Sequence, residues 1–196
     1  MQGTNIADWW ETITRQKAHH NVGGLPKRMN LDVIEPLAGV YKVVVRTLAR
    51  SLGLPSKVYL RQPSPGPGNA IRMYPPITRE KARVLGIANR ILEEVVERHY
   101  RDPQKRPSQY YGSLPSDELC GLEGDERIYG HTLCVSAFAA GPRESYASLK
   151  PFRFTEACEA EITRRLQNEI RMPDNTPFVQ VFRNMGGKPP GTTEPN

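Results

Sequence analysis

The sequence has few cysteines and no long apolar run, and each absence excludes a class of protein. It contains only Cys120, Cys134 and Cys158 among 196 residues. An odd and sparse set does not build the disulfide framework of a small secreted domain, so we expect reduced thiols. Uninterrupted apolar runs are short, such as Val43–Val45, whereas a bilayer-spanning helix needs about 20 residues. The sequence therefore predicts neither a disulfide scaffold nor a transmembrane segment.

Signatures of catalysis and of phosphate binding are also missing. Neither the P-loop pattern nor G-x-G-x-x-G occurs, and Gly66-Pro67-Gly68 contains too much proline to form a nest of backbone amides. The paired carboxylates Glu93 and Glu94 fall on the polar face of a predicted helix, where solvation is the simplest explanation. No serine-centred elbow is present. We therefore predict that the chain is not an enzyme and holds no cofactor.

A metal site receives little support from the spacing of possible ligands. His131-x-x-Cys134 is one close pair, whereas Cys120 and Cys158 stand alone in the sequence. A structural zinc site needs two close pairs. We assign no metal site and keep His131, Cys134, Cys120 and Cys158 as weak candidates.

Proline and glycine are abundant, with 18 and 16 residues, and they gather between the predicted helices. The densest stretch, Leu54 to Pro76, contains six prolines. Proline is excluded from helix interiors and central strands, and a compact enzyme rarely has a connection of this length. We therefore expect extended segments that lie on partner proteins, with Trp9, Trp10, Tyr110 and Tyr111 available to such partners.

The positive charge lies in the first third of the chain. Residues 1–72 hold ten Lys/Arg and four Asp/Glu, a balance of +6, and the remaining residues hold seventeen of each. Basic residues interleaved with tyrosines can bind RNA phosphates and bases, anionic lipid or an acidic protein, or can serve solubility alone. The candidates for partner binding are Trp9, Trp10, Tyr41, Lys42, Arg46, Arg50 and Arg61.

Helical periodicity and capping residues predict three main helices, over residues 32–52, 78–100 and 155–171. Gly53, Thr78 and Thr155 supply the expected end signals. We expect loops at 102–115, a single turn at 116–122 and an extended segment at 178–182. The segment 127–140 is ambiguous and could be a strand, a short pair of strands or a buried helix. The predicted fold is mainly α, a small helical core with long Pro/Gly-rich irregular extensions and at most one short β element.

This pattern divides the chain into five parts. They are an N-terminal arm with a short helix (1–30), a helix (31–53), a Pro-rich crossing segment (54–76), a helical core with loops (77–172) and a C-terminal extension (173–196).

Val40-Tyr41-Lys42, followed by Arg46 and Arg50 on the same predicted helix, resembles the motif of the mitochondrial LYR proteins. Their signature is a Leu-Tyr-Arg triplet near the start of an amphipathic helix, with further basic residues behind it. These proteins are small helical bundles that serve as accessory subunits or assembly factors of respiratory complexes, and many bind acyl carrier protein. The resemblance implies that Tyr41, Lys42 and Arg46 contact such a partner. The prolines of 54–76 occupy the place of the family's second helix.

From these observations we predict a non-catalytic accessory subunit of a large, membrane-associated respiratory or ATP-synthase assembly. The expected location is the mitochondrial matrix or inner membrane. The expected partners are other protein subunits, with acyl carrier protein, anionic lipid or RNA as further possibilities. A mitochondrial ribosomal protein that contacts rRNA is the alternative, and a small enzyme or zinc-bound domain is a more distant one.

Overall fold

The computed structural model describes residues 30, 32, 34–62, 68–140 and 149–187. The chain divides into two units, Met1–Arg61 and Gln62–Asn196, and each is described here by itself. None of the described helices combines the length and the apolar composition that a membrane span requires.

The first unit contains two short helices, α2 (Lys42–Ser51) and α3 (Ser56–Tyr59). The predicted helix at 32–52 is therefore shorter than expected, since residues 36–39 form turns instead. Gly39 lies in this stretch, and the flexibility of glycine disfavours continued helix. The predicted stop at Gly53 is confirmed. Gly53 has a φ of +74°, and the amides of Gly53 and Leu54 donate to the carbonyls of Arg50 and Ala49, as in a Schellman motif.

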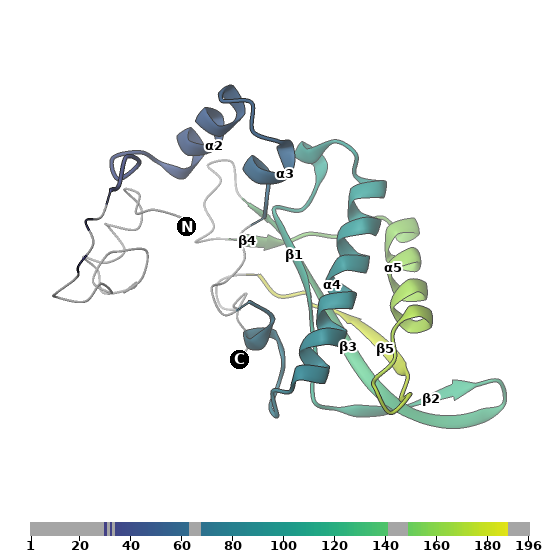
Figure 1. Cartoon of the computed structure of the whole chain (residues 1–196). Coiled ribbons are helices and arrows are strands. Elements are labelled where there is room, and N and C mark those ends of the chain that lie inside the picture. Colours follow the sequence, from purple (N-terminus) through teal and green to yellow (C-terminus); the bar gives the residue numbers. More distant parts are fainter. Residues whose placement is uncertain (1–29, 31, 33, 63–67, 141–148, 188–196) are drawn as a thin grey trace. The chain divides into compact units, whose positions relative to one another are not determined.

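The second unit contains two long helices, α4 (Arg79–His99) and α5 (Glu156–Glu169), which lie side by side in Figure 1. Both follow the prediction closely. Thr78 Oγ1 accepts a hydrogen bond from the Lys81 amide at 3.1 Å, and Thr155 Oγ1 accepts one from the Cys158 amide at 3.4 Å. Each bond satisfies an amide that the first helical turn leaves without a partner.

A five-stranded sheet accompanies these helices, so the mainly α prediction is wrong and the fold is α/β. Its strands are β1 (Gln109–Ser113), β2 (Glu118–Glu123), β3 (Glu126–Ala140), β4 (Leu149–Pro151) and β5 (Phe178–Arg183). The expected loop at 102–115 and the expected turn at 116–122 instead contain β1 and β2. The ambiguous segment 127–140 is strand, and the expected extended segment at 178–182 is confirmed as β5.

The long strand β3 organises the sheet, because all four other strands pair with it. β1, β2 and β4 are antiparallel to β3, and β5 is parallel to it. β2 and the first part of β3 form a hairpin around Gly124, which has a φ of +62°. This hairpin extends past the ends of the helices in Figure 1. Pairing between segments far apart in sequence, and not local propensity, makes these residues strands.

The core lies between α4, α5 and one face of the sheet. It includes Leu85, Leu92, Leu133 and Leu166, each at most 1% exposed. The expectation that Tyr110 and Tyr111 await a partner is wrong, because their exposed fractions are only 7% and 2%. The end of the Pro-rich segment also packs here: a 3-10 helix, η1 (Gly68–Arg72), precedes the buried Met73. The second unit therefore has its own hydrophobic core.

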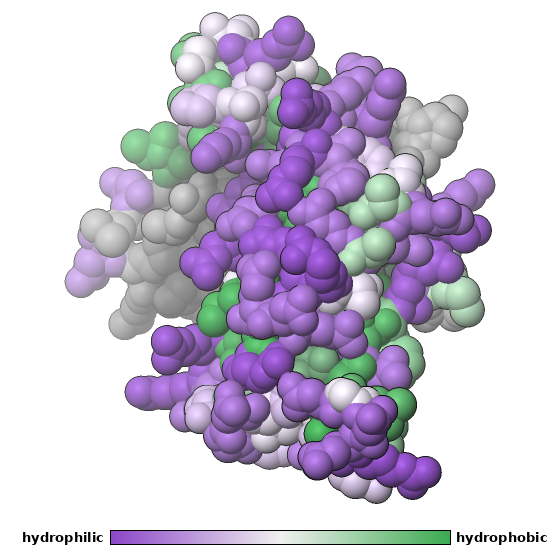
Figure 2. All heavy atoms as spheres, turned by 90° about the vertical axis from the view of Figure 1, so that its right-hand side faces the viewer, coloured by the Kyte–Doolittle hydropathy of each residue, from purple (hydrophilic) through white to green (hydrophobic). Residues whose placement is uncertain are grey.

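Charged residues cover the outer faces of the two helices. Arg165 of α5 donates to Glu94 of α4 at 2.9 Å and to Glu169 at 2.7 Å. Glu161 of α5 accepts hydrogen bonds from Arg98 and His99 of α4. Figure 2 shows a mostly hydrophilic surface on this side, with apolar residues in small groups. This is the surface of a solvated helix layer.

Candidate functional site: the polar face of the sheet

The helices α4 and α5 cover one face of the sheet, and neither of these two helices covers the other face. Successive side chains of a strand point to opposite faces. Leu133, Val135 and Ala137 of β3 belong to the core with the helices. Cys134 and Ser136, which alternate with them, therefore point to the opposite face. This second face is the candidate site.

The second face carries buried polar side chains beside an apolar cluster of Tyr111, Phe138 and Leu149. Thr132, Ser136, Ser113 and Gln109 are each at most 5% exposed. Buried polar groups cost free energy unless they are hydrogen-bonded. Asn184, directly after β5, donates from Nδ2 to Ser136 Oγ at 3.2 Å, and Ser113 Oγ donates to the Cys134 carbonyl at 3.4 Å. The buried Thr132 Oγ1 has no hydrogen-bond partner among the described residues.

Arg72 and Tyr111 form a stacked pair at this face. The guanidinium carbon of Arg72 lies 4.0 Å from the centroid of the Tyr111 ring, a cation–π geometry. Burial raises the pKa of Tyr111, and this effect outweighs the opposing influence of its hydrogen bond with Ser136 and of the Arg72 charge. The tyrosine hydroxyl is therefore neutral at physiological pH. It can donate or accept, while the aromatic ring holds the arginine in place.

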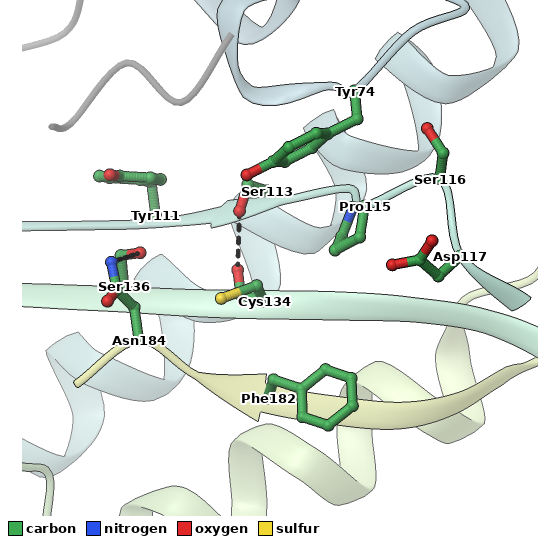
Figure 3. Close-up of a pocket in the computed structure, with 10 residues that line it drawn as sticks. All are labelled: Tyr74, Tyr111, Ser113, Pro115, Ser116, Asp117, Cys134, Ser136, Phe182 and Asn184. Atoms are coloured by element: carbon green, nitrogen blue, oxygen red, sulfur yellow. Dashed lines mark hydrogen bonds between the residues drawn. The ribbon is translucent and has the colours of Figure 1, made fainter. Parts of the chain in front are cut away.

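A cavity of about 500 Å³ opens on this face (Figure 3). The lining residues come from β1, β3, β5 and the segments next to them: Tyr74, Tyr111, Ser113, Pro115, Ser116, Asp117, Cys134, Ser136, Phe182 and Asn184. In Figure 3 the rings of Tyr74 and Phe182 lie on opposite sides of Ser113 and Cys134. The carboxylate of Asp117 lies at one end. The cavity volume falls within the usual range for small-ligand sites, roughly 300–1,000 Å³.

The lining groups favour binding over covalent chemistry. They offer hydroxyls, one amide, one carboxylate and the three aromatic rings of Tyr74, Tyr111 and Phe182. Burial raises the pKa of the Cys134 thiol, and its hydrogen bond with Ser113 only partly opposes this effect. That thiol is therefore protonated at neutral pH and is a poor nucleophile. No histidine is among the described residues that line the cavity, and these residues therefore offer no cysteine–histidine pair.

None of the partner-binding residues predicted from sequence is among the described residues that line the cavity. Trp9 and Trp10 are outside the described residues. Tyr41, Lys42, Arg46, Arg50 and Arg61 belong to the first unit, whereas the cavity belongs to the second. Arg46 donates from Nη2 to the Arg61 carbonyl at 3.2 Å. These residues remain a separate prediction.

The four weak metal candidates do not form one cluster. Cys158 is buried in the core between helices and sheet. Cys134 points to the opposite face, and Cys120 is exposed on β2. His131 lies opposite Glu118 in the hairpin. Within the part of the chain that the structure describes, no group of three or more possible metal ligands occurs.

Sequence reasoning missed the cavity residues, although one signal was available. In Thr132–Phe138, the residues at even positions are Thr, Cys, Ser and Phe, and those between them are Leu, Val and Ala. This alternation predicts a strand with one apolar and one more polar face. Tyr74 and Asn184 carry no such signal, because they reach the cavity only through the pairing of distant segments.

Comparison with known proteins gives the chain a different relationship from the one predicted. It is 48% identical over 135 residues to a subunit of the glutamine-hydrolysing GMP synthase of Pyrococcus abyssi, a match that covers 69% of this chain and 42% of that subunit. It is 36% identical over 207 residues to the corresponding subunit of Methanopyrus kandleri, over 99% of this chain and 60% of the subunit. It is 38% identical over 199 residues to a glutamine-hydrolysing GMP synthase of Aeropyrum pernix, over 99% of this chain and 37% of the relative.

The chain thus spans 37–60% of the length of these relatives. The Aeropyrum protein is not named as a subunit, and a stretch of similar size covers a smaller share of it. The matched region therefore occurs both in separate subunits and in a longer chain. No protein-family model matches the chain.

These homologues overturn the predicted identity. The resemblance to LYR proteins is wrong, because a three-residue motif is outweighed by identity over nearly the whole chain. The homologues are enzymes, so the predicted non-catalytic accessory subunit is wrong, as are its alternative of a ribosomal protein and its respiratory and acyl carrier protein partners. The mitochondrial location is wrong as well, because these relatives come from archaea, which lack mitochondria.

Proposed function

We propose that this chain is part of a glutamine-hydrolysing GMP synthase and that its cavity binds the guanine nucleotide. The observation that carries the first statement is the identity of 36–38% to GMP synthases over 99% of the chain. Similarity of this extent includes the residues of both α4 and β3 and is not confined to one motif. The cavity is where this chain offers a site of suitable size and chemistry.

The lining groups match the parts of a guanine nucleotide. A purine is flat and can stack between aromatic rings such as those of Tyr74 and Phe182. The guanine edge presents neighbouring N–H donors, which a carboxylate such as Asp117 can accept as a pair. Hydroxyls on the cavity floor and the Asn184 amide suit a ribose. Arg72, stacked on Tyr111, adds a fixed positive charge to this face.

Calorimetric titration of GMP into the full chain tests the cavity, with AMP as the comparison ligand. Asp117→Asn should weaken GMP binding by roughly 10- to 100-fold, the effect of one charge-assisted hydrogen bond, and should leave AMP binding unchanged. Tyr74→Ala should weaken both ligands, because stacking does not distinguish the bases. The matched controls are Asp125→Asn and Tyr129→Ala, both in the exposed β2–β3 hairpin.

Equal GMP affinity in Asp117→Asn and Asp125→Asn would remove the cavity from the proposal. The proposal that the chain is part of a GMP synthase would then rest on the homologues alone, and measuring GMP formation would test it.

A further inference from the structure

The first unit has an apolar surface that it does not bury itself. Tyr41, Val44, Leu48 and Leu52 repeat at helical spacing along α2 and are between 42% and 71% exposed. Leu54, Val58 and Leu60, around α3, are also exposed. We call Val44, Leu48 and Leu52 the α2 stripe. None of the described residues of this unit is buried.

Such a helix needs a packing partner. α2 has only ten residues, and isolated helices shorter than about 12–15 residues are marginal in water. In proteins, most helical stability comes from packing of the apolar face. The described contacts of α2 within its unit are with α3, which also has no buried residue. An apolar surface of this kind commonly marks an interaction site.

We propose that the α2 stripe docks against the part of the GMP synthase that lies outside this chain. This inference rests on the proposed function. The relatives are longer than the matched region, and we take this additional part as the binding partner of the stripe. The matched region covers 60% of the Methanopyrus subunit and 37% of the Aeropyrum enzyme, so 40% and 63% of these proteins lie outside it. The second unit, by contrast, has a continuous core of its own.

The α2 stripe is distinct from the basic residues of α2 that were predicted earlier as partner contacts. At about 100° per residue, Arg46 and Arg50 fall on the side of α2 opposite the stripe. Arg46 is already engaged with the Arg61 carbonyl. Docking through the stripe therefore leaves Arg50 accessible. This difference provides a control within the same helix.

The experiment measures thiol labelling of two variants, Leu48→Cys and the control Arg50→Cys. Mass spectrometry of the labelled peptides separates these positions from Cys120, Cys134 and Cys158. Each variant is labelled twice: as the purified 196-residue chain, and in the assembly that a tagged copy of the chain carries from its native cells, selected for glutamine-dependent GMP formation. We expect both positions to react in the isolated chain. In the active assembly, Leu48→Cys should react at least about tenfold more slowly and Arg50→Cys at an unchanged rate.

The alternative occupants give different results. Protection of Leu48→Cys in the isolated monomer would mean that residues of this chain cover the stripe, and this would overturn the inference. Protection that appears only with dimerisation, measured by sedimentation at rising concentration, would assign it to a second copy and would also overturn it. If Leu48→Cys reacts as fast in an active assembly as in the isolated chain, the docking proposal is wrong, whereas the proposed function is unaffected. An assembly without GMP formation would instead count against the proposed function.

Discussion

Replacing Gly130 with alanine should damage the junction between β3 and β5. A Cβ atom at this position would lie 2.5 Å from the Pro177 carbonyl oxygen and 2.7 Å from Cγ1 of Val179. The same carbonyl oxygen accepts the hydrogen bond from the His131 amide at 2.9 Å. Because the closest atom belongs to the backbone, the clash can be relieved only if the start of β5 moves away from β3.

The expected cost follows from two contributions. Overpacking of a well-packed site costs about 1–3 kcal/mol, and losing the His131 hydrogen bond adds about 1 kcal/mol. Alanine also restricts the conformations of the unfolded chain, and this effect raises the free energy of unfolding by about 0.4–1 kcal/mol. We therefore expect Gly130→Ala to lower the free energy of unfolding by about 2–3 kcal/mol.

Gly112→Ala is the matched control in a neighbouring strand. There the new Cβ would meet methyl carbons of Leu133 and Leu85 at 3.5 Å, which is ordinary contact, so the stability should change by less than about 1 kcal/mol. Urea unfolding followed by far-UV circular dichroism is the suitable assay, because the only tryptophans, Trp9 and Trp10, lie outside the sheet unit. Equal stability of the two variants would refute the described pairing of β3 with β5.

Further predictions concern the core and two titrating groups. Leu92→Ala should destabilise by about 3–5 kcal/mol in urea unfolding, because Leu92 is 1% exposed, and Leu52→Ala, at an exposed position, by less than about 0.5 kcal/mol. The hydrogen bond from His99 lowers the pKa of Glu161 from its ordinary value of 4.5. The ionised Glu161 therefore stabilises the fold above pH 4.5, and this stabilisation is lost as the pH falls through the lowered pKa. Glu161→Gln should reduce this loss of stability in acid. Burial raises the pKa of Tyr110 from 10.0 to about 12, so wild-type stability should fall between these two pH values, and Tyr110→Phe should reduce that fall. An unchanged loss of stability in acid for Glu161→Gln, or in alkali for Tyr110→Phe, would contradict the role given to that residue.

Local signals in the sequence accounted for the two long helices and not for the sheet. Thr78 and Thr155 cap their helices as predicted, because a cap and an apolar stripe act within a few residues of each other. Gln109–Ser113 was expected to be loop, since prolines precede it and a glycine lies within it. Its strand character comes from pairing with residues 134–138, a relationship that periodicity within one segment does not contain.

Proline and glycine content misled the interpretation of function more than that of structure. The segment 54–76 was interpreted as lying on partner proteins, yet Met73 is 1% exposed in the core, and Leu114 exchanges backbone hydrogen bonds with Arg72 and Tyr74. The cavity was beyond reach for a related reason. It collects residues from β1, β3, β5 and three further segments, and no short motif joins them.

Glutamine-dependent GMP formation by a chimera tests the central claim most directly. The chimera is the Aeropyrum pernix GMP synthase with its matched 199-residue region replaced by this chain. We predict GMP formation well above that of the enzyme with the region deleted, and a large loss of it on Asp117→Asn but not on Asp125→Asn. A soluble chimera that shows the circular dichroism of a folded protein and yet forms no more GMP than the deletion would contradict the account.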